Sequence, residues 1–335
     1  FLPTYFLTVA VPRMMPVGGG LAIVETLGDM ADREARVFYE TTARRLVQDE
    51  TGAVVGLEAV GRGNRRILFR APSVILACGG FEGNPEMLAQ YLGPRARYLR
   101  PIARGGYYNR GEGVAMGLEA GAAPCGDFGS YHAEPVDLRS GQHEPCVMAF
   151  SYGILVNKEG ERFCDEGPDT VDSVYEPVTR RIHAQTDGIA YMILDGRIED
   201  VPNWQKAVRS DQKPYEADTL DGLAAQLDVD AETLAATVAR YNAACPAEDG
   251  FKPLEVDGLA TTGLRPVKSN WARPLDRAPF RAWPIISANV FTFGGLKVDP
   301  DARVLNRDGQ VMPGLYAAGE TMGLFFNPYT GSTSV

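Results

Sequence analysis

The sequence has 335 residues, of which 45% are hydrophobic, and its formal net charge at pH 7 is −10. This length and hydrophobic content allow a large buried core and favour two domains. The acidic balance disfavours nucleic acids and anionic membrane surfaces as partners, and no apolar run approaches the roughly 18 residues that span a membrane.

The first part of the chain predicts a glycine turn followed by helices and strands. A glycine run at residues 18–20 precedes apolar residues at helical spacing, which predicts a helix. Residues 35–61 predict a strand, a loop and a hairpin, and residues 66–76 predict the next strands. A second amphipathic helix is expected over residues 112–123.

The stretch PSVILACGG contains an apolar run, residues 74–77, that leads through Cys78 to Gly79 and Gly80. A continuous apolar run is typical of a strand that is covered on both faces in a parallel sheet. Paired glycines at its carboxyl end let a ligand approach the backbone, and ligands bind at that edge of open α/β sheets. A tight strand-to-helix turn explains the same glycines equally well.

The character of the sequence changes near Gly126. Residues 153–167 predict a strand, a turn and a second strand, and two helices are expected over residues 219–227 and 230–245. Asp230 is the expected N-cap of the second helix. The following segment, residues 271–285, is punctuated by prolines and predicts extended structure.

The last part of the chain repeats the earlier pattern of an apolar strand that ends at glycine. Residues 292–320 predict a strand, a hairpin at Asp308-Gly309 and an apolar strand that ends at Gly319-Glu320. Near the end, Ser332, Thr333 and Ser334 predict the start of a helix, because all three are favourable N-cap residues. The sequence also begins without Met, so the chain is interpreted as a fragment.

Several other catalytic signatures do not occur. The sequence has no GxSxG, no HExxH and no P-loop. The stretch GEGVAMG, residues 111–117, is the nearest match to a dinucleotide fingerprint and leaves an NADP-dependent enzyme as a weak alternative. The five cysteines lack CxxC spacing, which disfavours a metal or disulfide framework and favours a cytoplasmic location.

Five motifs occur in one order and together cover essentially the whole chain: VILACGGFEGNPEM, YYNRGEGVAMGLEAGA, GILVNKEGERFCDE, ATVARYNAAC, and GLYAAGETMG with YTGSTSV. The set resembles the flavoprotein family of fumarate reductase, the succinate dehydrogenase flavoprotein subunit, 3-ketosteroid dehydrogenases and tricarballylate dehydrogenase. The segments WARPLDRAPF and FTFGGLKV are most similar to the tricarballylate dehydrogenase branch.

The resemblance implies an α/β fold with a Rossmann-type FAD-binding domain interrupted by an α+β cap domain. We expect the first part of the FAD-binding domain at residues 1–125, the cap at 126–288 and the second part at 289–335. The family's N-terminal GxGxxG segment and C-terminal helix have no counterpart in this sequence, so the FAD-binding domain is expected to be incomplete.

The resemblance also implies which residues contact FAD. The expected set is Ala77, Cys78, Gly79 and Gly80 at a strand end, Gly18, Gly19 and Gly20 near the isoalloxazine, Gly111, Glu112 and Gly113, Gly319 and Glu320, and Ser332, Thr333, Ser334 and Val335. In this match the carboxylate of Glu320 holds ribityl hydroxyls. The backbone at residues 332–335 faces the flavin N1/C2 carbonyl edge, where a helix N-terminus stabilises the reduced anion.

The expected substrate site differs from that of fumarate reductases. His132 matches the family's substrate-binding histidine, but Phe291 stands for the second histidine, Thr170 for the proton-delivering arginine and Tyr329 for the last clamping arginine. Losing these cationic groups removes charge-assisted binding of a dicarboxylate. Tyr329 instead resembles the tyrosine of 3-ketosteroid and tricarballylate dehydrogenases, where a phenol polarises a carbonyl or carboxylate oxygen.

We therefore expect an FAD-dependent, tricarballylate-dehydrogenase-like oxidoreductase acting on a CH–CH bond next to a carboxylate or ketone. It would use a small-molecule substrate and a separate electron acceptor, with His132, Tyr131 and Tyr152 as candidate bases. Arg162 is expected to order a turn in the cap. A 3-ketosteroid dehydrogenase-like enzyme and a catalytically inactive flavoprotein fragment remain alternatives.

Overall fold

The computed structural model describes residues 6–10, 17–247, 249–327 and 329. The helices are α1 (Gly19–Glu34), α2 (Pro85–Leu92), α3 (Glu112–Glu119), α4 (Val171–His183), α5 (Leu220–Leu227) and α6 (Ala231–Ala244). The strands are β1 (Thr42–Gln48), β2 (Val54–Gly61), β3 (Arg65–Arg70), β4 (Val74–Leu76), β5 (Arg100–Pro101), β6 (Pro124–Cys125), β7 (Tyr131–Asp137), β8 (Ile154–Val156), β9 (Ile189–Leu194), β10 (Tyr215–Ala217), β11 (Phe280–Thr292), β12 (Gly295–Leu296), β13 (Arg303–Leu305) and β14 (Val311–Ala317).

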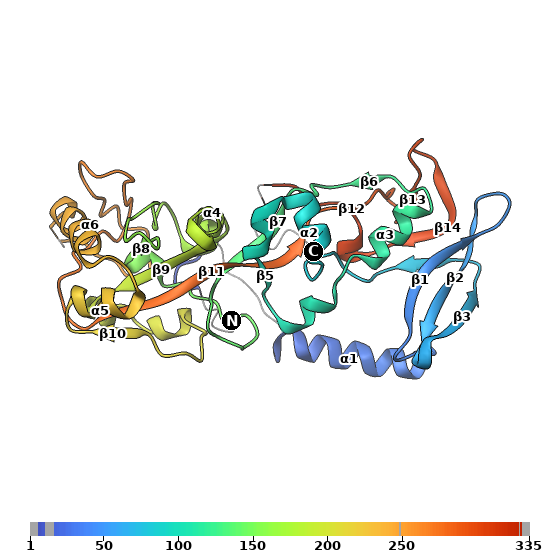
Figure 1. Ribbon diagram of the computed structural model, residues 1–335, viewed down its shortest axis with the longest axis horizontal. Helices are drawn as coiled ribbons and strands as arrows, with labels where there is room; N and C mark the ends of the chain where they lie inside the picture. The colour runs from blue at the N-terminus through green and yellow to red at the C-terminus, as the bar shows by residue number, and fades with distance from the viewer. Residues whose placement is uncertain (1–5, 11–16, 248, 328, 330–335) are drawn as a thin grey trace.

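The molecule is elongated, and the long strand β11 connects its two lobes (Figure 1). One lobe holds α4 to α6 with β8 to β10, and the other holds α3 with β1 to β4, β13 and β14. In the first lobe the sheet has the order β10-β11-β9-β8, and β5 and β7 also pair with β11. The predicted mixed α/β fold is therefore confirmed.

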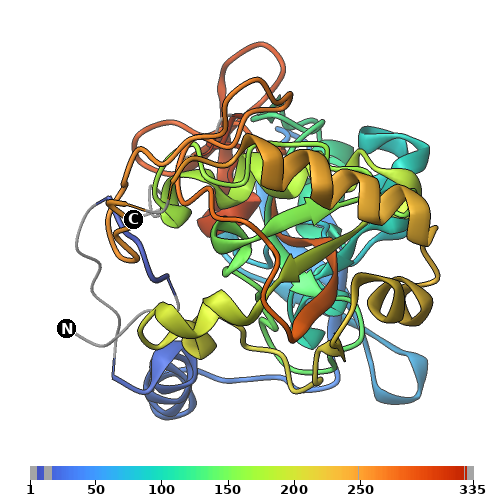
Figure 2. The same ribbon diagram turned by 90° about the vertical axis from the view of Figure 1, so that its left-hand side faces the viewer.

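Helices cover both faces of the sheet in the first lobe. Successive strand residues point to opposite faces, so both sets of side chains are buried. In β8, Ile154 and Val156 pack with α5 and α6, whereas Leu155 packs with α4. Figure 2 shows α6 lying across the strands of this lobe. Asp230 caps α6 as predicted, since its carboxylate accepts a hydrogen bond from the backbone N–H of Thr233 at 2.8 Å.

In the second lobe the two apolar strands that end in glycine pair with each other. β4 and β14 are parallel neighbours, with Val74 opposite Leu315, so both glycine-terminated strands end at the same edge. This pairing agrees with one domain built from both ends of the chain. The predicted boundary at residue 288 falls inside β11, and the domain boundaries stay a prediction.

Two local predictions need correction. The strand predicted after the turn at residues 158–160 is only an isolated bridge between Val156 and Arg162. α3 ends at Glu119 rather than near 123, because Gly121 adopts a left-handed φ of +101° and the chain turns back there. α4 and the strand β7 were not predicted. The helix start expected at Ser332, Thr333 and Ser334 lies outside the described residues.

Within the described part of the chain, no helix combines the length and the apolar character that crossing a bilayer requires.

A buried charge cluster holds the turn that follows β8. The side chain of Arg162 is 5% exposed and those of Glu166 and Lys268 are fully buried. The guanidinium donates to both Glu166 oxygens and to the Pro266 carbonyl, which confirms that Arg162 orders this turn. Lys268 Nζ lies 3.8 Å from Glu166 and donates to two backbone carbonyls in the segment before β8.

We predict that Glu166→Gln destabilises the protein by about 3–5 kcal/mol, because it leaves two buried cations with no balancing carboxylate. Thermal unfolding measures the effect, and Glu161→Gln is the matched control because Glu161 is exposed on the same turn. Equal melting temperatures for the two variants would contradict the prediction.

Candidate functional site

The carboxyl end of β4 presents backbone and small side chains. Ala77 and Cys78 are exposed, Gly79 has a φ of +76°, and Gly80 is buried. A Cβ atom on Gly80 would lie 2.1 Å from Oε1 of Glu320 and 2.2 Å from Oγ1 of Thr292. Only glycine therefore fits at residue 80 without displacing these two side chains.

The carboxyl end of β4, the start of α3 and the turn after β14 lie together here. A Cβ on Gly113, in the first turn of α3, would lie 2.3 Å from the Cys78 sulfur. The Thr321 hydroxyl, in the turn after β14, donates to the Gly79 carbonyl at 3.1 Å. The predicted residues at 77–80, 111–113 and 319–320 are thus brought together by close backbone contacts.

Glu320 is held from the end of β11. Its Oε1 accepts hydrogen bonds from the backbone N–H of Thr292 at 2.7 Å and from the Thr292 hydroxyl at 3.1 Å. The same hydroxyl accepts from the Phe81 N–H at 3.1 Å. Burial raises the pKa of Glu320 above its usual range. Sequence reasoning missed Thr292, whose signal was its position next to Phe291.

His132 lies at the start of β7 and is only 5% exposed. Its Nε2 is 3.1 Å from the Tyr175 hydroxyl, and its Nδ1 has no hydrogen-bond partner among the described residues. Burial, with a smaller contribution from the positive charge of Arg180, lowers the pKa of His132 to about 3. The imidazole is therefore neutral at physiological pH and keeps one nitrogen for a further hydrogen bond.

Tyr329 packs directly against His132, with 4.6 Å between the ring centroids. Phe291 contacts both rings, at 5.4 Å from His132 and 5.2 Å from Tyr329. Phe293 and Phe325 complete an aromatic cluster around Tyr329. His132 and Tyr329 therefore lie side by side, whereas their predicted role toward substrate stays a prediction.

β11 joins the two groups of predicted residues. Phe291 packs on His132 and Tyr329, and the next residue, Thr292, binds Glu320. Two consecutive residues of β11 therefore contact the predicted cofactor residue Glu320 and the predicted substrate residues His132 and Tyr329.

Other predicted residues lie elsewhere or outside the described chain. Gly18, Gly19 and Gly20 begin α1, which has no buried residue and runs along one side of the molecule in Figure 1. Their predicted flavin contact is untested. The predicted residues Ser332, Thr333, Ser334 and Val335 lie outside the described residues.

Two of the candidate bases have their hydroxyls engaged. The Tyr152 hydroxyl donates to the Pro253 carbonyl, and the Tyr131 hydroxyl lies 3.4 Å from Ser287 Oγ. Burial raises the pKa of both phenols, which disfavours their ionised forms. Thr170, which is expected at the position of the family's proton-delivering arginine, precedes α4, and its hydroxyl donates to Asp172 Oδ1.

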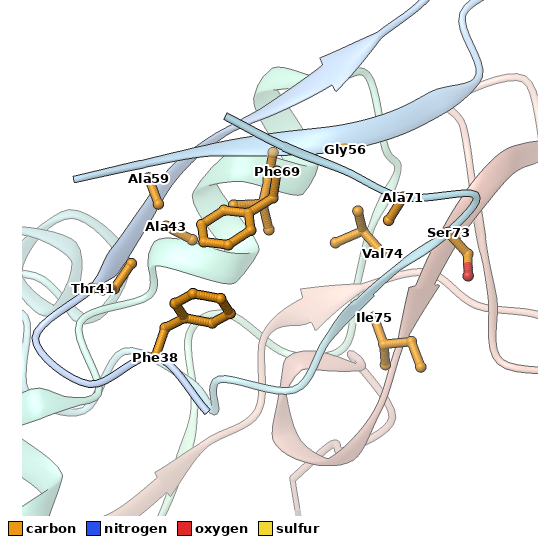
Figure 3. Close-up of a pocket in the computed structure, with 11 residues that line it drawn as sticks. Phe38, Thr41, Ala43, Gly56, Ala59, Phe69, Ala71, Ser73, Val74 and Ile75 are labelled. Atoms are coloured by element: carbon orange, nitrogen blue, oxygen red, sulfur yellow. The ribbon is translucent and has the colours of Figure 1, made fainter. Parts of the chain in front are cut away.

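A cavity of about 400 Å³ lies between the sheet β1-β2-β3 and β4. The Phe38 and Phe69 rings lie next to each other in its lining (Figure 3) and make an edge-to-face contact with centroids 5.0 Å apart. Its lining is mainly aliphatic and aromatic and contains no acid, base or thiol. This cavity therefore offers shape and apolar contact but no group for chemistry.

The chain matches the FAD binding domain family over residues 3–334. It is 31% identical over 325 residues to an NADH:acrylate oxidoreductase of Vibrio harveyi, covering 91% of this chain and 29% of that protein. An open flavocytochrome c3 fumarate reductase structure has a TM-score of 0.71 at 25% identity, covering 92% of this chain and 52% of that one. The 3-ketosteroid-Δ4-(5α)-dehydrogenase of Rhodococcus jostii RHA1 has a TM-score of 0.63 at 26% identity, covering 93% and 61%.

The chain belongs to the FAD-binding flavoprotein family that includes fumarate reductase, which confirms the predicted resemblance. FAD is the cofactor of this family, as the sequence predicts. The chain spans between about a third and three fifths of the length of these relatives.

The residues at the ends of β4 and β14, where the glycines lie, fit this cofactor. Ala77, Cys78 and Gly319 leave the backbone accessible, and a Cβ on Gly319 would meet no atom within 4 Å. Beside them, a buried oxygen of Glu82 has no hydrogen-bond partner among the described residues. Buried acceptors suit the hydroxyls of a dinucleotide, and accessible backbone lets its other groups approach closely.

We predict that Gly80→Ala lowers both flavin content and stability, the latter by about 1–3 kcal/mol, because the added methyl displaces Glu320 and Thr292. Flavin absorbance per protein and thermal unfolding measure the two effects. Gly105→Ala is the matched control, since a Cβ there meets no atom within 4 Å. Unchanged flavin content in Gly80→Ala would argue against this site.

Proposed function

We propose that the protein is an FAD-dependent oxidoreductase that acts on a CH–CH bond next to a carbonyl group. The observation that carries the proposal is the continuity at the end of β11, where Phe291 belongs to the His132–Tyr329 cluster and Thr292 holds Glu320. A flavin held at the glycine-terminated ends of β4 and β14 would lie next to that cluster. Hydride transfer requires such adjacency of cofactor and substrate.

The residues proposed to hold FAD are those at the three converging elements. Ala77, Cys78, Gly79 and Gly80 present backbone, Gly111, Glu112 and Gly113 form the start of α3, and Gly319 and Glu320 follow β14. Glu320 is proposed to accept hydrogen bonds from ribityl hydroxyls. When bound, FAD supplies the exchange of hydride with carbon.

His132 and Tyr329 are proposed to orient the substrate. The neutral imidazole of His132 has a free Nδ1 that can hydrogen-bond a substrate oxygen. The Tyr329 phenol is proposed to donate to a carbonyl oxygen, which stabilises the charge that develops when an adjacent carbon loses or gains a proton. The surrounding aromatic rings exclude water and strengthen both hydrogen bonds.

The lining of this cluster favours a substrate with an apolar body and a ketone. Phe291, Phe293 and Phe325 surround Tyr329. Arg180, whose charge reaches His132, is already paired with Glu176. Apolar and aromatic surface binds a ring or alkyl body better than several carboxylates. The similarity to a 3-ketosteroid dehydrogenase supports the same choice.

Tricarballylate is the second candidate, supported by the similarity of two sequence segments to that dehydrogenase branch. A tricarboxylate needs cationic partners. Anaerobic titration of the purified flavoprotein distinguishes the two candidates. Bleaching of the oxidised flavin band by a cyclic ketone, and not by tricarballylate, is expected. Absence of any flavin band in the purified protein would sink the proposal and favour an inactive flavoprotein fragment.

We predict that Glu320→Ala weakens FAD binding by about 1–3 kcal/mol, because ribityl hydroxyls lose their acceptor while they remain buried. Titration of the apoprotein followed by flavin fluorescence measures the affinity. Glu119→Ala, at the exposed end of α3, is the control. If both variants bind FAD as wild type does, Glu320 is not part of the cofactor site.

We predict that Tyr329→Phe lowers kcat by on the order of tenfold to a thousandfold and leaves flavin content unchanged, because it removes one hydrogen-bond donor and little volume. Steady-state kinetics on a substrate that bleaches the flavin measures the change. Tyr215→Phe on β10, in the other lobe, is the control. A Tyr329→Phe enzyme with full turnover would exclude the polarising role of the phenol.

A further inference from the structure

Glu82 is a buried carboxyl group in the motif VILACGGFEGNPEM, and neither the expected FAD contacts nor the proposed reaction assigns it a role. It lies two residues beyond Gly80 and is only 3% exposed. Its Oε1 accepts a hydrogen bond from the Asn109 side-chain amide, and its Oε2 has no hydrogen-bond partner among the described residues. An unpaired buried oxygen is costly, so this atom calls for a physical explanation.

Glu320 is the ionisable residue whose charge and side-chain hydrogen bond act on Glu82, so the two carboxyl groups interact directly. Ionised carboxylates only accept hydrogen bonds, so two of them in contact repel and leave an oxygen unsatisfied. One proton shared by the pair removes both problems, because an O–H of one acid then donates to an oxygen of the other. Burial and the charge of Glu320 raise the pKa of Glu82 to about 8.

The hydrogen-bond donors decide which residue keeps the proton. Glu320 receives the N–H and O–H of Thr292 and the backbone N–H of Gly80, all of which favour its ionised form. Glu82 receives the Asn109 side-chain amide and its own backbone N–H. The proton therefore resides on Glu82.

We propose that Glu82 is a positioning residue that carries the proton of this pair and donates a hydrogen bond to Glu320, which keeps Glu320 ionised and oriented toward the cofactor. The inference rests on the proposed contact of Glu320 with the ribityl hydroxyls of FAD. A fixed carboxylate loses less entropy when the cofactor binds, so Glu82 contributes to affinity without touching the ligand.

Several other groups face the pair. They are Asn109 and Arg110 after the 3₁₀ turn Arg104–Tyr108, Tyr107 within that turn, and Arg97 in the turn Pro94–Tyr98. Arg97, Tyr107 and Arg110 line a cavity of about 380 Å³ together with Glu82. All three are exposed, so water screens the pull of the two arginines on the proton.

Thermal unfolding as a function of pH tests the proton on Glu82 without any cofactor. The pKa of Glu82 is higher in the folded than in the unfolded protein, so the stabilisation is complete below pH 4 to 5 and is lost as the pH rises through about 8. Glu82→Gln, whose amide donates in place of the acid O–H, should flatten this loss between pH 5 and 9. Glu86→Gln, an exposed change on α2, should keep the wild-type profile. Parallel profiles for wild type and Glu82→Gln would overturn the proposal.

FAD affinity at pH 6 and pH 9 tests the link to the cofactor. We expect wild type to bind more weakly at pH 9, Glu82→Gln to bind equally well at both pH values, and Glu82→Ala to bind on the order of tenfold more weakly at pH 6. An unchanged affinity in Glu82→Ala would overturn the positioning role.

Glu320→Gln separates this inference from the proposed function. If it binds FAD normally while Glu82→Gln still flattens the stability profile, the shared proton is supported and the contact of Glu320 with FAD is wrong.

Discussion

The hydrogen bonds from Thr292 to Glu320 are the contact on which the arrangement of the site depends. Thr292 is the last residue of β11, the strand that connects the lobes, and Glu320 follows β14. The Thr292 hydroxyl also accepts from Phe81, which ties in the chain just beyond β4. A single side chain thus sets the positions of two glycine-terminated strands relative to the cluster around His132. Its hydrogen bonds are effective because the surrounding atoms are buried and water does not compete.

His132 and Glu82 are both buried without an ion-pair partner among the described residues, and this decides their protonation states. His132 lies among aromatic rings beside a cation, so its neutral form is favoured. Glu82 lies beside another carboxyl group, so its acid form is favoured. Both effects have one origin, the cost of holding a charge in a poorly solvated environment. The first lobe holds buried charges in the opposite way. There Arg162 and Lys268 are buried around the carboxylate of Glu166, which supplies a counter-charge.

The sequence was most informative where backbone geometry restricts the choice of residue. The glycines at 79–80 and 113 were predicted to mark a ligand site. The structure shows that a side chain at residue 79 would meet Asn109, one at residue 80 would meet Glu320 and Thr292, and one at residue 113 would meet Cys78. Thr292 and Glu82 were not predicted, because a threonine or a glutamate at a strand end is common for many reasons. Their importance comes from partners that are 28 and 238 residues away in the chain.

The sequence by itself determined the family, the order of its motifs and the two apolar strands that end in glycine, because these depend on local residue patterns. The resemblance further led us to expect Phe291 and Tyr329 where fumarate reductases carry imidazole or cationic groups, and that match stays a prediction. Only the tertiary structure decided that Tyr329 packs on His132, that Thr292 binds Glu320 and that Glu82 lies beside another carboxyl group. These contacts join distant segments, and the protonation states follow from their burial, which no local pattern encodes.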